Sequence, residues 1–299
     1  MILVCGASGA VGGRIVRGLR ATGEPVRALV RPRFDAAALR DIGVEVVPGD
    51  FRDADSLRRA VAGVTTVVST VTVIARALAG EKDADFRRVD LEGHRELISA
   101  AEGAGVQRFV FVSATRMRVQ PTAGLPLGAG KIATEERLFG SPLREVVIRP
   151  DQFQEMWLAP ISRFDWPKRR VVIFGAGETP SRYIATDDVA EAAVRLTLAG
   201  DPPRVIEIGG PEALTRKQAV GVFEHALGEP IARRHVPRAG LRLGIVALRR
   251  LRPALASVMA GALSADLYPA TWDDRPLRDL GIEPRSVKAY AESVTRAAR

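Results

Sequence analysis

Three glycines near the start of the chain have the spacing of a phosphate-binding turn. Gly6, Gly9 and Gly12 occur in the run G-A-S-G-A-V-G, directly after the apolar residues Ile2–Cys5 and at the start of a helical pattern. Where a strand turns into a helix in this way, backbone N–H groups and the positive end of the helix can face a pyrophosphate. We therefore predict that a dinucleotide contacts the whole run, which comprises Gly6, Ala7, Ser8, Gly9, Ala10, Val11 and Gly12.

Each glycine of this turn has its own expected role. Gly6 permits the tight turn, Gly9 lets a phosphate approach closely, and Gly12 lets the helix pack on the strand. Ser8 offers a further hydroxyl donor. The alternative is a purely structural turn in an α/β protein without a cofactor.

Arginines follow the second predicted strand, Val26–Val30, where a carboxylate would select NAD(H). A carboxylate there bonds the ribose 2′-hydroxyl and repels a 2′-phosphate, but this chain has Arg31 and Arg33. Guanidinium groups pair with phosphate, often through two hydrogen bonds. We predict NADP(H) rather than NAD(H), with Asp50 facing the adenine; the alternative is that both arginines only solvate a loop.

Strand patterns and helical patterns alternate through the first half of the chain, separated by short polar breaks. This alternation is typical of βα units, whose right-handed crossovers put helices on both faces of a parallel sheet. We predict an α/β fold with a doubly wound parallel sheet in residues 1–150 and a smaller mixed C-terminal lobe in residues 151–299, some segments of which return to the main sheet. The predicted strands are Ile2–Cys5, Val26–Val30, Val44–Val47, Thr65–Val71, Arg108–Val112 and Glu145–Ile148.

The composition is that of an ordinary globular protein. Of the 299 residues, 46% are hydrophobic and 26% are charged, which supplies enough apolar material for a sizeable core. The single cysteine, Cys5, excludes an intramolecular disulfide framework. Because strand residues begin at Ile2, we expect no export signal and a reducing, cytoplasmic location.

The formal net charge of +9 is spread over most of the predicted helices. We interpret it as an arginine-rich composition and expect no specific nucleic-acid partner. The main local exception is the stretch 233–252, in which seven arginines surround apolar residues. The uncharged run that follows, Pro253–Leu263, is well short of the roughly 20 residues that span a bilayer. We predict no transmembrane segment and interpret this stretch as a lid or surface helix.

Eight motifs, taken in chain order, resemble the NmrA-like, atypical branch of the short-chain dehydrogenase/reductases. The resemblance implies a Rossmann core, a C-terminal substrate lobe and a cofactor that lies across the carboxyl ends of the strands. We predict Ser69 and Thr70 among the residues that contact it. The motifs are G-A-S-G-A-V-G (6–12), G-D-F-R-D (49–53), V-D-L-E-G (89–93), A-G-V-Q-R-F-V-F-V-S (104–113), K-I-A-T-E-E (131–136), I-R-P (148–150), Y-I-A-T-D-D-V-A (183–190) and I-G-G-P-E-A-L-T (208–215).

The catalytic set that the resemblance implies is only partly present. In the superfamily a Ser or Thr after the fifth strand, a Tyr, and a Lys four residues later cooperate in proton transfer coupled to hydride transfer. Ser113 matches the first position and Lys131 the last, whereas Leu127 stands where the tyrosine would be. Leucine can neither give nor accept a proton. The predicted catalytic residues are therefore Lys131 and Ser113.

The resemblance gives Lys131 two further interpretations. Some NmrA-like reductases retain only the lysine, which holds the nicotinamide ribose and serves as acid or base. Other NmrA-like proteins bind the dinucleotide and act as redox-responsive regulators. The alternative without a cofactor is a solvated helix lysine that pairs with Glu135 four residues later.

A mixed polar and aromatic segment follows the I-R-P motif. Asp151, Gln152, Phe153, Met156 and Trp157 would suit a substrate with an apolar ring and polar groups. The same residues equally suit a hinge between lobes.

Other site chemistries are not favoured by the residues. His94, His225 and His235 are far apart and lack zinc-ligand spacing, so we predict no metal, and we interpret His94 as structural. No G-x-S-x-G elbow or P-loop is present. Tyr183 is interpreted as a packing residue, and Tyr268 as a candidate replacement proton donor.

Two classes of function fit these residues. The first is an NADP(H)-dependent oxidoreductase that reduces a small carbonyl, quinone or enone. The second is a non-catalytic NADP(H)-binding redox sensor or assembly factor, whose basic C-terminal lobe docks a partner. A nucleotide-sugar epimerase or dehydratase needs the missing tyrosine and is the weakest hypothesis. A homodimer is left open.

Overall fold

The computed structural model describes residues 1–298, and the chain forms two compact units. The first unit contains residues 1–114, 129–149 and 189–206, and the second contains residues 115–128, 150–188 and those from 207 onward. The chain therefore passes between the units several times. One of these passages lies between Arg149 and Pro150, at the end of the sixth strand.

Seven strands form the main sheet, in the order β3-β2-β1-β4-β5-β6-β9. The pairings from β3 to β6 are all parallel. Their central strands are apolar on both faces, as expected where helices cover a parallel sheet on both sides. The strand bounds are β1 Ile2–Cys5, β2 Val26–Val30, β3 Glu45–Pro48, β4 Thr66–Ser69, β5 Arg108–Val112, β6 Arg144–Pro150 and β9 Val205–Ile208.

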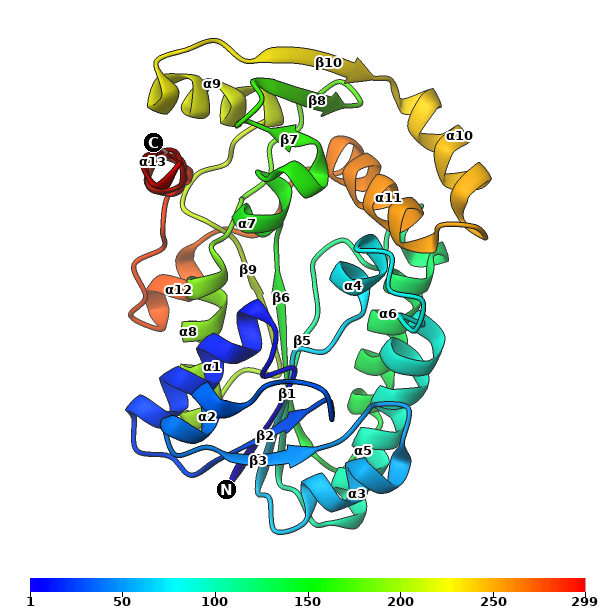
Figure 1. Cartoon of the computed structure of the whole chain (residues 1–299), viewed down its shortest axis with the longest axis vertical. Coiled ribbons are helices and arrows are strands. Elements are labelled where there is room, and N and C mark those ends of the chain that lie inside the picture. The colour runs from blue at the N-terminus through cyan, green and yellow to red at the C-terminus, as the bar shows by residue number, and fades with distance from the viewer. Residues whose placement is uncertain (299) are drawn as a thin grey trace. The chain divides into compact units, whose positions relative to one another are not determined.

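Helices cover both faces of this sheet (Figure 1). On one face, α1 contacts α8 so closely that a side chain at Gly18 would meet Val194. On the other face α3 packs on α5, and Arg137 of α6 forms an ion pair with Glu102 of α5. The helix bounds are α1 Ala10–Ala21, α2 Ala37–Asp41, α3 Ala54–Val61, α4 Ile74–Leu78, α5 His94–Gly103, α6 Pro126–Phe139 and α8 Thr186–Leu198, with a π-helix η1 at Arg87–Gly93.

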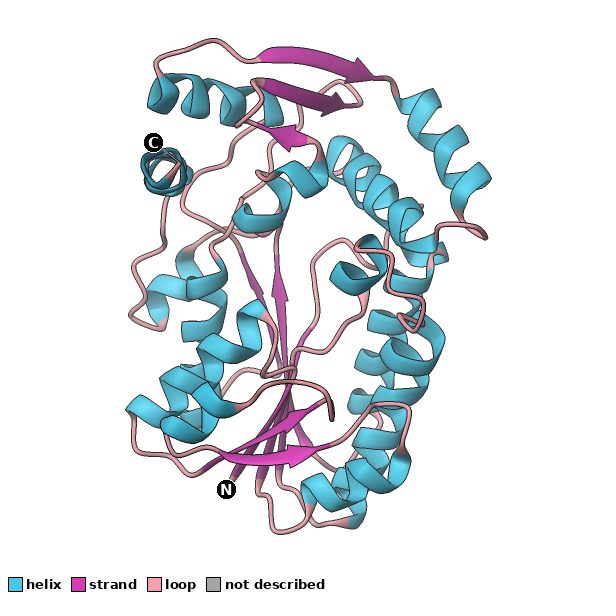
Figure 2. Cartoon of the chain, in the orientation of Figure 1, coloured by secondary structure: helices cyan, strands magenta, loops and turns pink. Residues whose placement is uncertain are grey.

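The second unit contains a sheet of three strands, in the order β10-β8-β7. β10 pairs with β8 in parallel and β7 pairs with β8 antiparallel, and helices lie beside this small sheet (Figure 2). The bounds are β7 Phe164–Asp165, β8 Arg170–Phe174, β10 Ala232–Val236, α7 Gln154–Trp157, α9 Arg216–Leu227, α10 Arg238–Leu248, α11 Pro253–Leu267, α12 Arg275–Asp279 and α13 Val287–Ala297, with 3-10 turns η2 Thr122–Gly124 and η3 Pro160–Ser162.

The predicted fold class is confirmed, including the doubly wound parallel sheet and the smaller mixed part. Three of the expected strands, Ile2–Cys5, Val26–Val30 and Arg108–Val112, have the predicted bounds. The other three differ by one or two residues at their ends, where strand assignment depends on hydrogen bonding to a neighbouring strand. The lid or surface helix expected over 233–252 is only partly right, since its first residues form β10 and only Arg238–Leu248 is helical. Among the described residues, no helix is long and apolar enough to cross a membrane.

Helix α3 begins at a side-chain cap on the loop that leaves β3. The Asp53 carboxylate accepts hydrogen bonds from the backbone N–H groups of Asp55 (3.0 Å) and Ser56 (3.3 Å). This cap fixes the loop that also contains Asp50 and Arg52.

We predict that Asp53→Ala lowers the free energy of unfolding by about 1 kcal/mol, because two N–H groups of α3 lose their acceptor. Urea denaturation followed by circular dichroism measures this change. Asp53→Ser is the matched control, since a serine hydroxyl also caps helices. Equal losses in the two variants would contradict the capping role.

Candidate functional site

The glycine turn joins β1 to α1, and it leaves no space for a side chain at Gly6 or Gly12. Gly6 has a φ of +93°, a conformation that favours glycine, and a Cβ there would collide with the Thr70 hydroxyl. A Cβ at Gly12 would collide with the Gly6 carbonyl. The turn closes through a hydrogen bond from the Gly9 N–H to the Gly6 carbonyl oxygen (2.8 Å). Helix α1 therefore starts pressed against the end of β1.

The open side of this turn is suited to an anion. Ser8, Gly9 and Ala10 are exposed, and Gly9 is the N-cap residue of α1 without a side-chain cap. The first turn of α1 contains no acidic residue, so its positive end has no carboxylate from that turn. Unpaired N–H groups at such a helix end bind phosphate.

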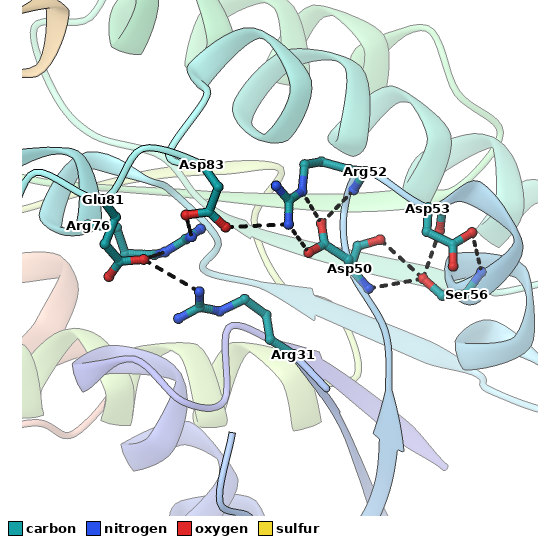
Figure 3. Close-up of polar contacts among 8 residues, drawn as sticks. All are labelled: Arg31, Asp50, Arg52, Asp53, Ser56, Arg76, Glu81 and Asp83. Carbon is teal, nitrogen blue, oxygen red and sulfur yellow. Dashed lines mark hydrogen bonds and ion pairs between the residues drawn. The ribbon is translucent and has the colours of Figure 1, made fainter. Parts of the chain in front are cut away.

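Arg31 directly follows β2, and its side chain is half-exposed. In Figure 3 its guanidinium group points toward Glu81. Its Nη1 is 3.6 Å from Oε2 of Glu81. Arg33 is exposed, two residues further along the same loop. The end of β2 thus carries positive charge, as the sequence predicts.

Asp50, the predicted adenine contact, has a carboxylate that is bound within its own loop. Arg52 donates to it from Nε (2.8 Å) and from Nη2 (2.6 Å). These hydrogen bonds from Arg52 hold the pKa of Asp50 below its usual value. Asp50 is therefore a carboxylate partnered by Arg52, and Figure 3 shows Arg52 joined to the carboxylates of both Asp50 and Asp83.

Arg76 of α4 completes a charged cluster that sequence reasoning missed. It donates from Nε to Glu81 (2.7 Å) and from Nη2 to Asp83 (2.6 Å), while Arg52 lies 3.5 Å from the same Asp83. Three arginines, Arg31 and Arg52 from two loops and Arg76 from α4, thus converge on two carboxylates of the 79–85 loop (Figure 3). Arg52 could have been found from its place in the G-D-F-R-D motif, just after a strand end.

The predicted contacts at the end of β4 differ in their surroundings. Thr70 lies against Gly6, and its backbone N–H donates to the Cys5 carbonyl (3.0 Å). Ser69 is fully buried, with its hydroxyl 3.1 Å from Nε2 of His94. Thr70 therefore borders the glycine turn, whereas the buried Ser69 hydroxyl contacts His94 instead.

His94 is a buried histidine held between aromatic rings. Phe51 and Phe111 pack edge-on against it at 5.0 and 5.2 Å. Burial lowers the pKa of His94 to about 3, so the ring is neutral at physiological pH. Since Nδ1 faces the Asp90 carbonyl at 3.2 Å, Nδ1 carries the proton and Nε2 accepts from Ser69. Its surroundings are those of a structural residue.

The Ser113 hydroxyl donates to a carboxylate. Its Oγ lies 2.6 Å from Oε1 of Glu135, and both side chains are buried. Arg149 neutralises this carboxylate through Nη2 (2.6 Å) and Nε (3.1 Å). The Ser113 proton is therefore engaged, and only the lone pairs of its oxygen remain for another group.

Lys131 is buried rather than solvated. Its Nζ donates to the Val112 carbonyl at 2.7 Å and lies 4.6 Å from the centre of the Phe111 ring. Burial lowers the pKa of Lys131 to about 8, and the nearby Asp90 and Glu135 carboxylates partly oppose that shift. The interpretation of Lys131 as a solvated helix lysine is therefore wrong. An amine with a pKa near 8 can exchange a proton near neutral pH.

Asp90 adds a second buried titratable group beside helix α6. Its Oδ2 accepts from the Val73 N–H (3.1 Å), and burial raises the pKa of its carboxyl. Oδ1 has no hydrogen-bond partner among the described residues. Helix α6 approaches closely here because Gly130 has no side chain, and a Cβ there would be 3.1 Å from the Asp90 Cβ.

The mixed segment after β6 belongs to the second unit and is described there by itself. The buried Asp151 carboxylate pairs with Arg116 and accepts the Arg182 backbone N–H (2.8 Å). Trp157 lines a small, partly open cavity of about 30 Å³. Its other lining residues include Gln152, Phe174, Tyr183, Arg216 and Asp266.

Polar groups in this cavity are largely held by the protein itself. Arg216 donates to the carbonyls of Val172 (2.8 Å), Trp157 (3.0 Å) and Ser162 (2.8 Å). Tyr183 is buried, and this burial raises the pKa of its hydroxyl. Tyr268, the other tyrosine considered from sequence, is 40% exposed. Among the described residues, no cluster of His, Cys, Asp or Glu could hold a metal ion.

Residues 6–199 match the model of a family described as NAD(P)H-binding. The chain belongs to that family. This match confirms the resemblance to the NmrA-like, atypical short-chain dehydrogenase/reductases. The description of this family names NAD(P)H binding.

Curated relatives differ in what their names describe. The chain is 32% identical to the photosystem II assembly factor Ycf39 of Guillardia theta, over 76% of this chain and 70% of that one. It is also 32% identical to a (4-alkanoyl-5-oxo-2,5-dihydrofuran-3-yl)methyl phosphate reductase of Streptomyces griseus, over 77% of this chain and 75% of the relative. The chain is 30% identical to the chloroplastic protein High Chlorophyll Fluorescence Phenotype 244 of Arabidopsis thaliana. That match covers 81% of this chain but only 59% of the relative's length.

A solved structure shares the fold over almost its full length. The NADPH-dependent quinone oxidoreductase QOR2 of Escherichia coli, crystallised with NADPH, superposes with a TM-score of 0.80. The match covers 99% of this chain and 100% of that one at 23% identity. At this identity the likeness establishes the fold.

We predict that Gly9→Val weakens binding of NADPH at least about tenfold, because a branched side chain at the exposed N-cap blocks the approach of a phosphate. Isothermal titration calorimetry measures the affinity. Gly140→Ala is the control, since a Cβ there meets only an ordinary contact at 3.7 Å. Unchanged affinity in Gly9→Val would exclude the turn as the pyrophosphate site.

Proposed function

We propose that the protein is an NADP(H)-dependent oxidoreductase that reduces a small carbonyl, quinone or enone. The observation that carries this proposal is the uncapped start of α1 at the glycine turn, in a chain of the NAD(P)H-binding family. The dinucleotide pyrophosphate would bind at Gly6–Gly12, with Thr70 at its border.

Positive charge after β2 supports NADP(H) over NAD(H). Arg31 and Arg33 are at the position where a carboxylate would repel a 2′-phosphate. Arg52 and Arg76 bring two further guanidinium groups into the same cluster (Figure 3). Glu81 and Asp83 now neutralise these arginines, and a phosphate dianion carries the charge to replace them.

Lys131 is the residue best suited to supply a proton. The reduced dinucleotide supplies the hydride when it is bound, so reduction of a carbonyl needs one further proton from the protein or water. The Lys131 ammonium donates one N–H to Val112 and keeps two others for a ribose hydroxyl or a substrate. Ser113, whose proton is held by Glu135, would serve as an acceptor that orients the nicotinamide amide or the substrate.

A second candidate function is NADP(H) binding without turnover, as in a redox sensor or an assembly factor. The absence of the family tyrosine favours it, because Leu127 has no proton to give. So does the identity to a protein named as a photosystem II assembly factor. The two candidates share the dinucleotide site and differ in whether Lys131 performs proton transfer.

We predict that Arg31→Ala weakens NADPH binding by about 10- to 100-fold and leaves NADH binding nearly unchanged, because the lost contact is to the 2′-phosphate. Calorimetric titration with both dinucleotides separates the effects. Arg58→Ala, which removes an exposed arginine of α3, is the matched control. Equal losses for both dinucleotides would refute the proposed selectivity.

We predict that the protein oxidises NADPH in the presence of quinones, aldehydes or enones as test substrates. Above pH 8, the value of kcat/KM should fall about tenfold for each pH unit. Lys131 has a folded-state pKa near 8, so its ammonium form is lost as the pH rises through that value. Lys131→Met should abolish both turnover and this pH dependence, whereas Lys288→Met, at an exposed site of α13, should change neither. Tight NADPH binding with no turnover on any substrate would favour the non-catalytic candidate.

A further inference from the structure

Helix α10 and the loop after it present a surface that the proposed function does not use. From Pro230 to Ala265 the chain has seven arginines and no aspartate or glutamate. Within this stretch, residues 238–252 consist only of Arg, Ala, Gly, Leu, Ile and Val. A folded surface with cations and aliphatic groups but no other polar side chain is unusual for a face that meets only water.

One face of α10 is anchored in the second unit. Leu241 and Ile245 are buried in an apolar cluster with Leu263 of α11. The helices pack closely at Gly244, where an added Cβ would overlap the methyl group of the Met259 side chain. The helix is therefore held on the unit through α11, next to which it lies in Figure 1.

The other face of α10 exposes large aliphatic side chains. Leu243 is 72% exposed and Val246 is 60% exposed, and Leu251 in the following loop is 82% exposed. On a helix with about 3.6 residues per turn, Arg242, Leu243 and Val246 project within about 100° of one another. Apolar groups and a cation thus share one outward face.

Most arginines of this stretch form no ion pair among the residues that the structure describes. Arg233 pairs with Glu224 and Arg238 with Asp266, so two of the seven are neutralised. Four others are exposed and form no ion pair among the residues that the structure describes: Arg242, Arg249, Arg250 and Arg252. We define the α10 surface as these four arginines together with Leu243, Val246 and Leu251.

We propose that the α10 surface docks on an anionic lipid bilayer. Leu243, Val246 and Leu251 would enter the boundary between headgroups and acyl chains, while the arginines bind lipid phosphates. The segment lies in the plane of the interface and does not cross it. This proposal is independent of the NADP(H) chemistry and gives the arginine-rich stretch a function.

The side chains favour a bilayer over a protein or a nucleic acid. Protein interfaces depend on aromatic anchors and paired hydrogen bonds, and residues 238–252 contain no aromatic residue and no hydroxyl, amide or carboxylate side chain. Nucleic acids offer phosphates to the arginines but leave exposed leucine and valine without an apolar partner. A bilayer interface satisfies both kinds of side chain at once.

The test is co-sedimentation of the full-length protein with vesicles of equal parts phosphatidylcholine and phosphatidylglycerol, compared with phosphatidylcholine alone. We expect binding to the anionic vesicles that weakens with added salt. Arg242→Gln with Arg250→Gln should reduce the partition coefficient about 25-fold, at about fivefold for each arginine near an anionic surface. Leu243→Ser with Val246→Ser should reduce it at least about tenfold without changing the net charge.

Matched controls remove similar side chains elsewhere. Arg58→Gln with Arg87→Gln removes two exposed arginines, and Ile161→Ser removes an aliphatic side chain that is 51% exposed. Neither should change vesicle binding, and all variants should keep the wild-type thermal unfolding midpoint because the altered side chains are exposed. The proposal is overturned if wild-type protein does not bind anionic vesicles, or if the α10 variants bind as well as the controls. Retention on duplex DNA or polyglutamate without vesicle binding would also overturn it, in favour of an acidic macromolecule.

Discussion

The close contact of β1 and α1 at the glycine turn is the constraint on which the proposed dinucleotide site depends. Because Gly12 lies on the Gly6 carbonyl, the helix axis points its first N–H groups at the edge of the sheet where the parallel strands end. A side chain at either position would push the helix away from the strand. No acidic residue or side-chain cap occupies the start of α1, so its capacity to bind an anion is retained.

Charge around this edge is balanced within the protein before any ligand enters. Arg31, Arg52 and Arg76 face Glu81 and Asp83, and Asp50 is tied to Arg52. Exposed ion pairs of this kind contribute little to stability, so exchanging them for a phosphate would cost little. Near Lys131 the balance is different. There, burial is the main influence, and it lowers the pKa of the Lys131 amine while it raises the pKa of the Asp90 carboxyl.

Besides its small sheet, the second unit contains two features with distinct side-chain composition, a cavity and the α10 surface. Its cavity is lined by aromatic rings and by polar groups that mostly bond to the backbone, as Arg216 does. Its α10 surface, by contrast, combines four arginines that form no ion pair within the described part of the chain with three exposed aliphatic side chains.

The sequence alone determined the fold class and the glycine turn, because strand and helix periodicity and the spacing of Gly6, Gly9 and Gly12 are encoded within a few residues. It also placed Arg31 at a strand end and, through the family resemblance, put Leu127 where a tyrosine was expected. Only the tertiary structure brought Arg76 and Asp83 to Arg52, bound the Ser113 hydroxyl to Glu135 and buried Lys131. Those contacts join residues far apart in the chain, so they depend on strand order and helix packing, which no local pattern specifies.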